Sequence, residues 1–216
     1  MVELTMNAIA YVTRAKTKGM NQDVIVSEVS TDTRNFPMGA LFVALRGDNF
    51  DGHNFAKQAL EMGACAVVVE DDEGLPEDKV LVVKDTRKAY LDIAHLHRSK
   101  CPAKVIAVTG SVGKTTTKEM IACILGAVGR TIKTKHNLNN EVGLAHMLLE
   151  IKPTHEYAVL ELGVDGPNQM LPMALAVAPD IAVITNIGIT HLEAFGSVEK
   201  IQKEKFTLAE GLRNDG

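Results

Sequence analysis

The feature that most constrains the fold is a regular alternation of short apolar runs and amphipathic segments in the second half of the chain. The apolar runs are Val105–Val108, Thr131–Thr134, Tyr157–Leu162 and Ile181–Ile187. Segments with helical periodicity fill the gaps, near Lys114–Ala127, Glu141–Ile151, Gly166–Val177 and Ser197–Leu212. Strands that are apolar throughout and alternate with helices are typical of a parallel sheet covered on both faces. The sequence therefore predicts an α/β domain.

The first part of the chain has a different rhythm, with short β-prone runs separated by turns. These runs are Leu41–Leu45, Ala66–Val69 and Val80–Val83, and the segment Asp51–Leu60 turns and then becomes a helix that Gly63 ends. A helix from Asp85 to about Ser99 follows. We therefore predict a small N-terminal α/β domain at residues 1–83 and a P-loop-like parallel-sheet domain at residues 84–216. A sheet of so few strands is small, so we expect this second domain to be truncated.

Composition and charge exclude several classes of protein. The net charge is −4, the 23 Lys and Arg residues are scattered and aromatic residues make up only 4%, so a nucleic-acid-binding surface is not expected. The three cysteines, Cys65, Cys101 and Cys123, form no CxxC pair, which argues against a disulfide framework or a zinc site. Cys65 and Cys123 lie in apolar stretches and are predicted to be buried. Met1–Thr5 does not resemble a signal peptide and no run approaches the ~18 apolar residues of a membrane span, so we predict a cytoplasmic protein without membrane insertion, and a monomer.

A glycine loop joins the first apolar run of the second domain to the helix that follows. Gly110-Ser111-Val112-Gly113-Lys114-Thr115 allows successive N–H groups to point at phosphate oxygens at a helix N-terminus. Lys114 is placed to reach the β- and γ-phosphates of ATP, and the Thr115 hydroxyl to hold Mg²⁺. The strict pattern fails, because Val108 stands where a further glycine is usual. A plain strand-to-helix turn is the alternative, but we predict an ATP site formed by Thr109, Gly110, Ser111, Val112, Gly113, Lys114, Thr115 and Thr116.

Polar residues also follow the later strands, at the carboxyl edge where ligands of open α/β sheets gather. Glu161 ends one strand and His191 follows the next, although such a carboxylate also caps turns and a single histidine is more often structural. Asn137, Asn139 and Asn140 precede a helix, where asparagine is a common cap, or they contact phosphate or a bound substrate. Asn139 is the first choice for the ATP site.

The shortened loop Thr109–Thr117 resembles that of the Mur ligase family, which joins amino acids or peptides to UDP-N-acetylmuramoyl precursors. Other stretches that resemble this family span nearly the whole chain in the family's order: Asp32–Arg34, Gly39–Gly47, Phe50–His53, Asn137–Gly143, Glu161–Gly163 and Thr185–Glu193. Two small departures are Thr33, where Ser is commoner, and Leu162, where Met is common.

The resemblance implies an ATP-dependent amide ligase with two Mg²⁺ ions. It implies catalytic roles for Lys114, Glu161, His191 and Lys205, and metal ligands in Thr115, Glu161, His191 and Lys205. Lys205 aligns with the lysine that the family carries as a carbamate. The helix around it reads by itself as a solvated charged face, and Lys203 is a competing candidate on another helical face.

The precursor is expected at the first domain, where Thr33, Arg34 and Arg46 flank strand ends and could hold the uridine or its diphosphate. Within this resemblance, the Asn137–Asn140 run and the Lys118-Glu119 pair are most similar to the family member that acts on UDP-N-acetylmuramoyl-tripeptide and D-alanyl-D-alanine, which implies these substrates. The alternatives are a family member that adds the third residue, and a non-catalytic nucleotide-binding module. Family enzymes have three domains, so a chain that carries the first and about half of the second is expected to be inactive alone.

Overall fold

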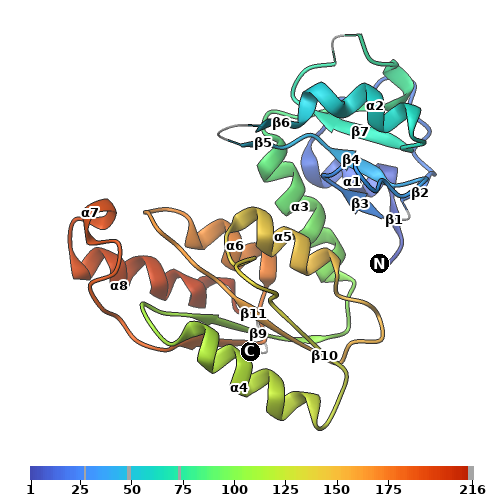
Figure 1. Cartoon of the computed structure of the whole chain (residues 1–216). Helices are drawn as coiled ribbons and strands as arrows, with labels where there is room; N and C mark the ends of the chain where they lie inside the picture. Colours follow the sequence, from blue (N-terminus) through green and yellow to red (C-terminus); the bar gives the residue numbers. More distant parts are fainter. Residues whose placement is uncertain (27, 48–49, 73, 214–216) are drawn as a thin grey trace. The chain divides into compact units, whose positions relative to one another are not determined.

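The computed structural model describes residues 1–26, 28–47, 50–72 and 74–213 (Figure 1). The chain forms two compact units, Met1–Leu96 and His97–Gly216. The division falls inside helix α3 (Thr86–Ser99), so the domain boundary at 83/84 stays a prediction. Across the described residues, none of the helices has the length and apolar character that a bilayer crossing requires.

The first unit is built on a parallel sheet in the order β3-β4-β7-β8. Its strands are β3 (Val29–Ser30), β4 (Leu41–Val43), β7 (Ala66–Val69) and β8 (Val80–Val82), so the three predicted runs are strands. Strand β4 ends before Leu45, because the Leu45 N–H turns back to the Val43 carbonyl and leaves the ladder. Strand β3 gave no recognisable signal, because it has only two residues.

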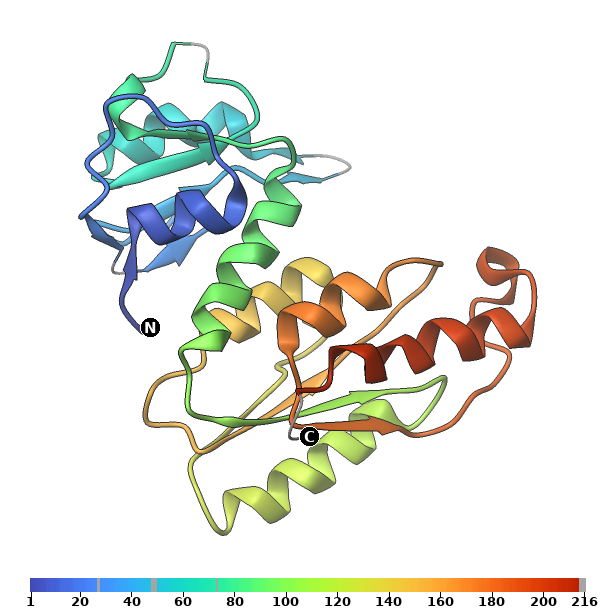
Figure 2. The ribbon, with the colours of Figure 1, turned by 180° about the vertical axis from the view of Figure 1, so that it is seen from behind.

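Helices cover both faces of this sheet (Figures 1 and 2). On one face, helix α2 (Ala56–Glu61) follows the 3₁₀ turn η1 (Gly52–Phe55) and packs Ala56 and Ala59 against Phe42, Val67 and Val69. Helix α1 (Met6–Thr13), which was not predicted, lies on the other face and is capped by the Thr5 hydroxyl. The remaining short elements are β1 (Leu4–Thr5), β2 (Ile25–Val26), β5 (Arg46–Gly47), β6 (Phe50–Asp51) and the 3₁₀ turn η2 (Glu77–Lys79).

The second unit contains the predicted parallel sheet, in the order β10-β11-β9-β12. The strands are β10 (Thr131–Lys133), β11 (Tyr157–Glu161), β9 (Lys104–Thr109) and β12 (Ile181–Ile184). Helix α4 (Lys114–Gly126) covers one face, and α5 (Glu141–Leu149), α6 (Met170–Val177) and α8 (Val198–Phe206) lie on the other (Figures 1 and 2). The expectation of an α/β fold with parallel sheets is confirmed.

Three predicted elements of this unit begin or end at least three residues away from their expected bounds. The helix predicted from Gly166 begins only at Met170, where the Glu204 carboxylate accepts the first N–H groups. The strand predicted to Ile187 ends at Ile184. The Thr185 N–H still donates to Thr109 at the end of β9, but the Thr185 hydroxyl and the Asn186 side chain bond to Val112 in the glycine loop. The helix predicted over Ser197–Leu212 becomes the 3₁₀ turn η3 (Thr207–Gly211) after Phe206, and the short helix α7 (Leu192–Phe195) precedes it.

The prediction of buried thiols is wrong for Cys123, which is exposed, and Cys65 is half-buried. Helix α4 and the turn after it leave apolar side chains in solvent, with Met120 and Ile124 of the helix and Val128 of the turn each more than half exposed. An apolar neighbourhood in the sequence therefore does not imply burial on this helix.

Candidate nucleotide and metal site

The glycine loop connects β9 to α4 as predicted. Gly110 and Gly113 have φ values of +148° and +82°, which side-chain-bearing residues rarely adopt. A Cβ atom at Gly110 would also collide with the Thr185 hydroxyl. Both glycines are therefore required by backbone conformation, and Gly110 also by the close approach of Thr185.

The segment after β12 fixes the shape of this loop. The Ser111 N–H donates to the Asn186 carbonyl and the Val112 N–H to Asn186 Oδ1, each at 3.0 Å. The Thr185 hydroxyl donates to the Val112 carbonyl at 2.6 Å, and Ser111 Oγ accepts the Gly188 N–H at 2.8 Å. Asn186 thus positions the loop, a role that the sequence did not reveal although the residue lies in one of the stretches that resemble the family.

Lys114 lies over the loop that it follows. Its Nζ donates to the Gly110 carbonyl at 2.8 Å and to the Ser111 carbonyl at 3.3 Å. The predicted contact of Lys114 with the β- and γ-phosphates stays a prediction. Thr116 is exposed on the first turn of α4. The hydroxyl of Thr109 donates to the Leu162 carbonyl at 2.8 Å, so it ties β9 to the end of β11.

A buried carboxylate stands beside the start of α4. Glu161, at the end of β11, is only 3% exposed. Its Oε2 accepts from the Thr115 hydroxyl at 2.9 Å, its Oε1 accepts from the Asn139 amide at 3.0 Å, and its N–H donates to Thr134 Oγ1 at 2.8 Å. The structure thus brings together three residues that the sequence placed in one site. A carboxylate and a hydroxyl are oxygen donors of the kind that Mg²⁺ prefers.

The asparagines before α5 divide between the two roles considered for them. The side chain of Asn140 accepts the Gly143 N–H at 2.9 Å and caps α5. Asn139 instead directs its amide to Glu161. Asn137 is exposed. Asn140 is therefore a helix cap, whereas Asn139 belongs with Thr115 and Glu161.

Lys205 is buried, with only 2% of its surface exposed, so the solvated face that its charged neighbours suggested is wrong for this residue. Burial and, to a smaller extent, the positive charge of Lys114 together lower the pKa of Lys205 to about 8, whereas the charge of Glu204 opposes the shift. Lys203, the competing candidate, is exposed. Its neighbour Glu204 accepts N–H groups of Asn168, Gln169 and Met170 at 2.7–2.9 Å and so fastens α8 to the start of α6.

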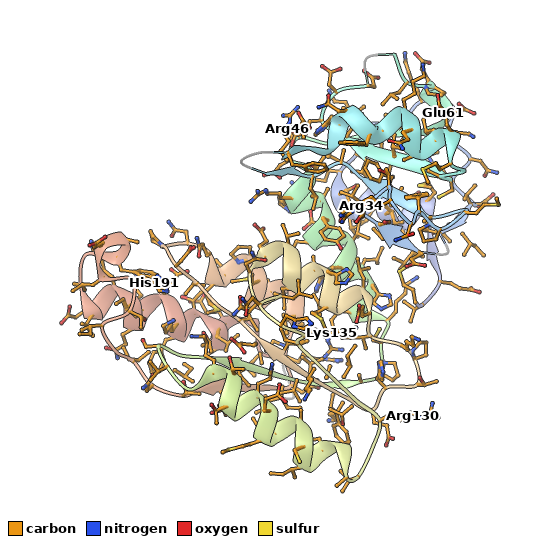
Figure 3. All side chains as sticks on the ribbon, in the orientation of Figure 1. Arg34, Arg46, Glu61, Arg130, Lys135 and His191 are labelled. Carbon is orange, nitrogen blue, oxygen red and sulfur yellow. The ribbon has the colours of Figure 1, made fainter. Side chains whose placement is uncertain are left out.

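His191 is exposed and lies just before α7, with φ +53° (Figure 3). No hydrogen bond or ion pair joins its imidazole to Glu161 or Lys205 in the described contacts. Within the described ranges, no three His, Cys, Asp or Glu side chains cluster in a way that could hold a metal ion. The metal-ligand roles of Thr115, Glu161, His191 and Lys205 therefore stay predictions.

In the first unit, a cavity of about 500 Å³ is lined by Thr31, Asp32, Thr33, Arg34, Phe42, Phe50 and Phe55. Arg34 forks onto the Asp32 carboxylate at 2.5–3.0 Å, and these bonds hold the pKa of Asp32 at about 2. Phe50 stacks on Phe55 with ring centroids 5.4 Å apart. The sequence did not predict either ring as part of this site, although Phe50 lies in a stretch that resembles the family.

Arg46, the third residue predicted here, does not line this cavity. Its guanidinium pairs with Asp51 of β6 at 3.1 Å and with Glu70, which follows β7, at 2.5 Å. Arg34 and Arg46 are both on the surface of the first unit (Figure 3).

A parallel α/β unit with a glycine loop, a loop lysine and a carboxylate at the neighbouring strand end defines a P-loop-type nucleotide-binding protein. Comparison with protein families is more specific. The Mur ligase middle domain matches residues 108–216, and the catalytic domain of the Mur ligase family matches residues 25–104. The chain belongs to the Mur ligase family.

Among individual relatives, the chain is 39% identical to the UDP-N-acetylmuramoyl-tripeptide--D-alanyl-D-alanine ligase of Escherichia coli, over all of this chain and 47% of that protein. It is 44% identical to the ligase of the same name from Synechocystis, over 88% of this chain and 42% of that one. The crystal structure of MurF from Acinetobacter baumannii superposes with a TM-score of 0.90 at 36% identity, covering 99% of this chain and 48% of that one. MurF from Thermotoga maritima in complex with ADP gives 0.79 at 32% identity, covering 86% and 43%. The chain spans about half the length of these relatives.

Proposed function

We propose that this chain carries the nucleotide and precursor sites of an ATP-dependent ligase that joins D-alanyl-D-alanine to UDP-N-acetylmuramoyl-tripeptide in the cytoplasm. The observation that carries the proposal is the buried Glu161 carboxylate, held between Thr115 and Asn139 beside the glycine loop. The names of the relatives support the choice of substrates. The ADP complex of the Thermotoga protein supports the choice of nucleotide.

The chemistry begins with a carboxylate that cannot react with an amine unaided, because the group to be displaced would be oxide. Transfer of the γ-phosphoryl group of ATP to a carboxylate oxygen of the precursor gives an acyl phosphate and ADP. The amine nitrogen of D-alanyl-D-alanine then attacks the carbonyl carbon, phosphate leaves with the bonding electron pair, and the nitrogen loses a proton. Phosphoryl transfer depends mainly on positioning and on neutralising negative charge.

The residues around the loop supply those two requirements. In this proposal Lys114 leaves the Gly110 and Ser111 carbonyls and donates to the β- and γ-phosphates, while the loop N–H groups orient them. Thr115 and Glu161 would hold Mg²⁺, which supplies additional positive charge to the phosphates when it is bound. Asn139 keeps the Glu161 carboxylate turned toward Thr115.

Lys205 is proposed to act as a carbamate. A neutral amine attacks CO₂, one N–C bond forms, and one proton is released. The low pKa of Lys205 makes the neutral amine available near neutral pH, because an ordinary lysine at ~10.4 is almost fully protonated there. The anionic carbamate would be an oxygen ligand for a second Mg²⁺ together with His191.

The cavity of the first unit is the proposed site for the uridine diphosphate end of the precursor. Its aromatic rings offer a flat apolar surface to a base, and Thr33 and Arg34 offer a hydroxyl and a cation at the same opening. Arg46 supports this site from the β5–β6 hairpin.

Calorimetric titration of the 216-residue chain tests the proposal. ADP with MgCl₂ should bind to the natural chain, and Glu161→Gln should weaken that binding at least tenfold. UDP-N-acetylmuramoyl-tripeptide should bind in preference to the dipeptide precursor. Preference for the dipeptide would favour the family member that adds the third residue, and a nucleotide affinity unaffected by Glu161→Gln would overturn the proposed site.

A further inference from the structure

A second buried lysine lies next to the candidate metal site and has no part in the chemistry above. Lys118, on α4, is 2% exposed. Its Nζ donates to the Thr134 carbonyl at 2.9 Å and pairs with Glu119 Oε1 at 3.0 Å. It also lies 4.0 Å from Glu161 Oε2, the oxygen that accepts from Thr115. A buried charge is costly unless opposite charge and hydrogen bonds compensate it, so this position requires an explanation.

The charges around Lys118 alternate in sign. Lys133 pairs with Glu119, Glu119 with Lys118, and Lys118 with Glu161. In the absence of any cation, the carboxylate that the proposed function assigns to Mg²⁺ is therefore already compensated by a fixed ammonium. A divalent ion that approaches Glu161 and Thr115 meets this ammonium at short range.

We infer that Lys118 is a positioning residue, an internal counter-ion that holds the Glu161 carboxylate in place and opposes the binding of a free divalent cation. The site therefore takes its metal as the metal–nucleotide complex, in which the phosphates add the negative charge that overcomes the ammonium. This inference rests on the proposed role of Glu161 as a metal ligand. In this inference Lys118 acts through the Glu161 carboxylate and does not touch the substrate.

Removal of this ammonium has an effect that damage to the fold would not produce. Lys118→Met deletes a positive charge a few ångströms from the cation, so free metal should bind more tightly, by on the order of tenfold or more. If Lys118 only packed the core, its loss would loosen Glu161 and weaken metal binding. The direction of the change thus separates a counter-ion from a structural lysine.

The experiment measures binding of Mn²⁺, as an EPR-visible stand-in for Mg²⁺, to the 216-residue chain with and without ADP. For the natural chain, we expect weak binding of free Mn²⁺ and much tighter binding when ADP is present. Lys118→Met should bind free Mn²⁺ more tightly than the natural chain even without ADP. The double variant Lys118→Met/Glu161→Gln should lose this added affinity. Lys104→Met is the matched control, because Lys104 is an exposed lysine at the opposite end of the same sheet, and it should bind like the natural chain.

A folded Lys118→Met protein that binds free Mn²⁺ no more tightly than the natural chain overturns the inference. If that variant does not fold, Glu119→Gln provides the test. It removes a half-exposed carboxylate that pairs with Lys118, so Glu161 becomes the remaining partner of the ammonium. Free Mn²⁺ should then bind several-fold more weakly, and unchanged or tighter binding refutes the counter-ion. Failure of Glu161→Gln to weaken Mn²⁺ binding with ADP present would instead refute the proposed function.

Discussion

Substitution of Lys205 by methionine should stabilise the second unit in a pH-dependent way. The pKa of this buried amine falls from 10.5 to about 8 on folding, because burial disfavours the ammonium. Below pH 8 both folded and unfolded chains hold the proton, and the folded chain bears the full penalty. At about 1.4 kcal/mol per pKa unit, that penalty is about 3 kcal/mol.

The sign follows from proton binding. Between pH 8 and 10.5 the unfolded chain holds more protons than the folded one, so the stability of the natural chain rises with pH in this window. Methionine has no such dependence. The stability advantage of Lys205→Met should therefore be about 3 kcal/mol larger at pH 7 than at pH 10.5.

Urea unfolding followed by circular dichroism, at pH 7, 8, 9 and 10.5, measures this difference. Each sample is compared with Lys203→Met, which changes an exposed lysine two residues away and should show no pH-dependent gain. Added bicarbonate should stabilise the natural chain near pH 8, because carbamate formation consumes the neutral amine of the folded chain and so shifts the equilibrium toward folding. It should not change the stability of Lys205→Met. A stability difference between the natural chain and Lys205→Met that is the same at pH 7 and 10.5 would show that Lys205 is not held in a pKa-lowering environment.

Four further outcomes are expected. Lys114→Ala should keep the fold and weaken binding of ADP by a factor of about 100, because the loss of one contact to the phosphates costs about 3 kcal/mol. Binding of ADP by this variant as tight as by the natural chain would refute the role of Lys114. Gly110→Ala should abolish nucleotide binding and lower the melting temperature, because its Cβ meets the Thr185 hydroxyl; an unchanged melt would contradict the loop geometry. The 216 residues alone should not incorporate D-alanyl-D-alanine, because the named relatives are about twice as long, and measurable product formation would show otherwise. In a ligase that contains the chain and is active, Lys205→Ala should lose activity and recover part of it with acetate or formate, whereas full activity without them would exclude the carbamate.

The parts of the fold that the sequence predicted are those set by local pattern. Buried strands such as Ala66–Val69 and the glycine loop at Gly110–Gly113 have signals within a few consecutive residues. Strands of two residues, such as Val29–Ser30, give no period to detect. The end of β12 was misjudged for a different reason: Ile187 continues an apolar run, but the Thr185 hydroxyl and the Asn186 side chain bond to Val112 in the glycine loop.

In the candidate site, too, the sequence predicted where some residues lie along the fold but not the long-range contacts of their side chains. Glu161 was found because parallel strands bring their carboxyl ends to one edge, which fixes its place without knowledge of its contacts. The rings of Phe50 and Phe55 were missed because their stacking joins a hairpin to a 3₁₀ turn. Lys118 lies in a helix that reads as ordinary, and only the packing of α4 against β10 and β11 shows that its charge is buried between Thr134 and Glu161.

Helix α8 explains why the burial of Lys205 was beyond prediction from its neighbours. The run Gln202–Lys205 has the composition of a solvated face, yet two long-range contacts decide which side turns inward. The Glu204 carboxylate accepts the N–H groups at the start of α6, and Gly211 approaches the Ala174 carbonyl so closely that no side chain would fit. These contacts fasten α8 and η3 to α6 at two points and leave Lys205 on the inner side. Glu204→Gln should therefore weaken the first contact, and exposure of Lys205 to amine-reactive labelling in that variant, but not in Glu199→Gln, would show that the α6 cap positions the lysine.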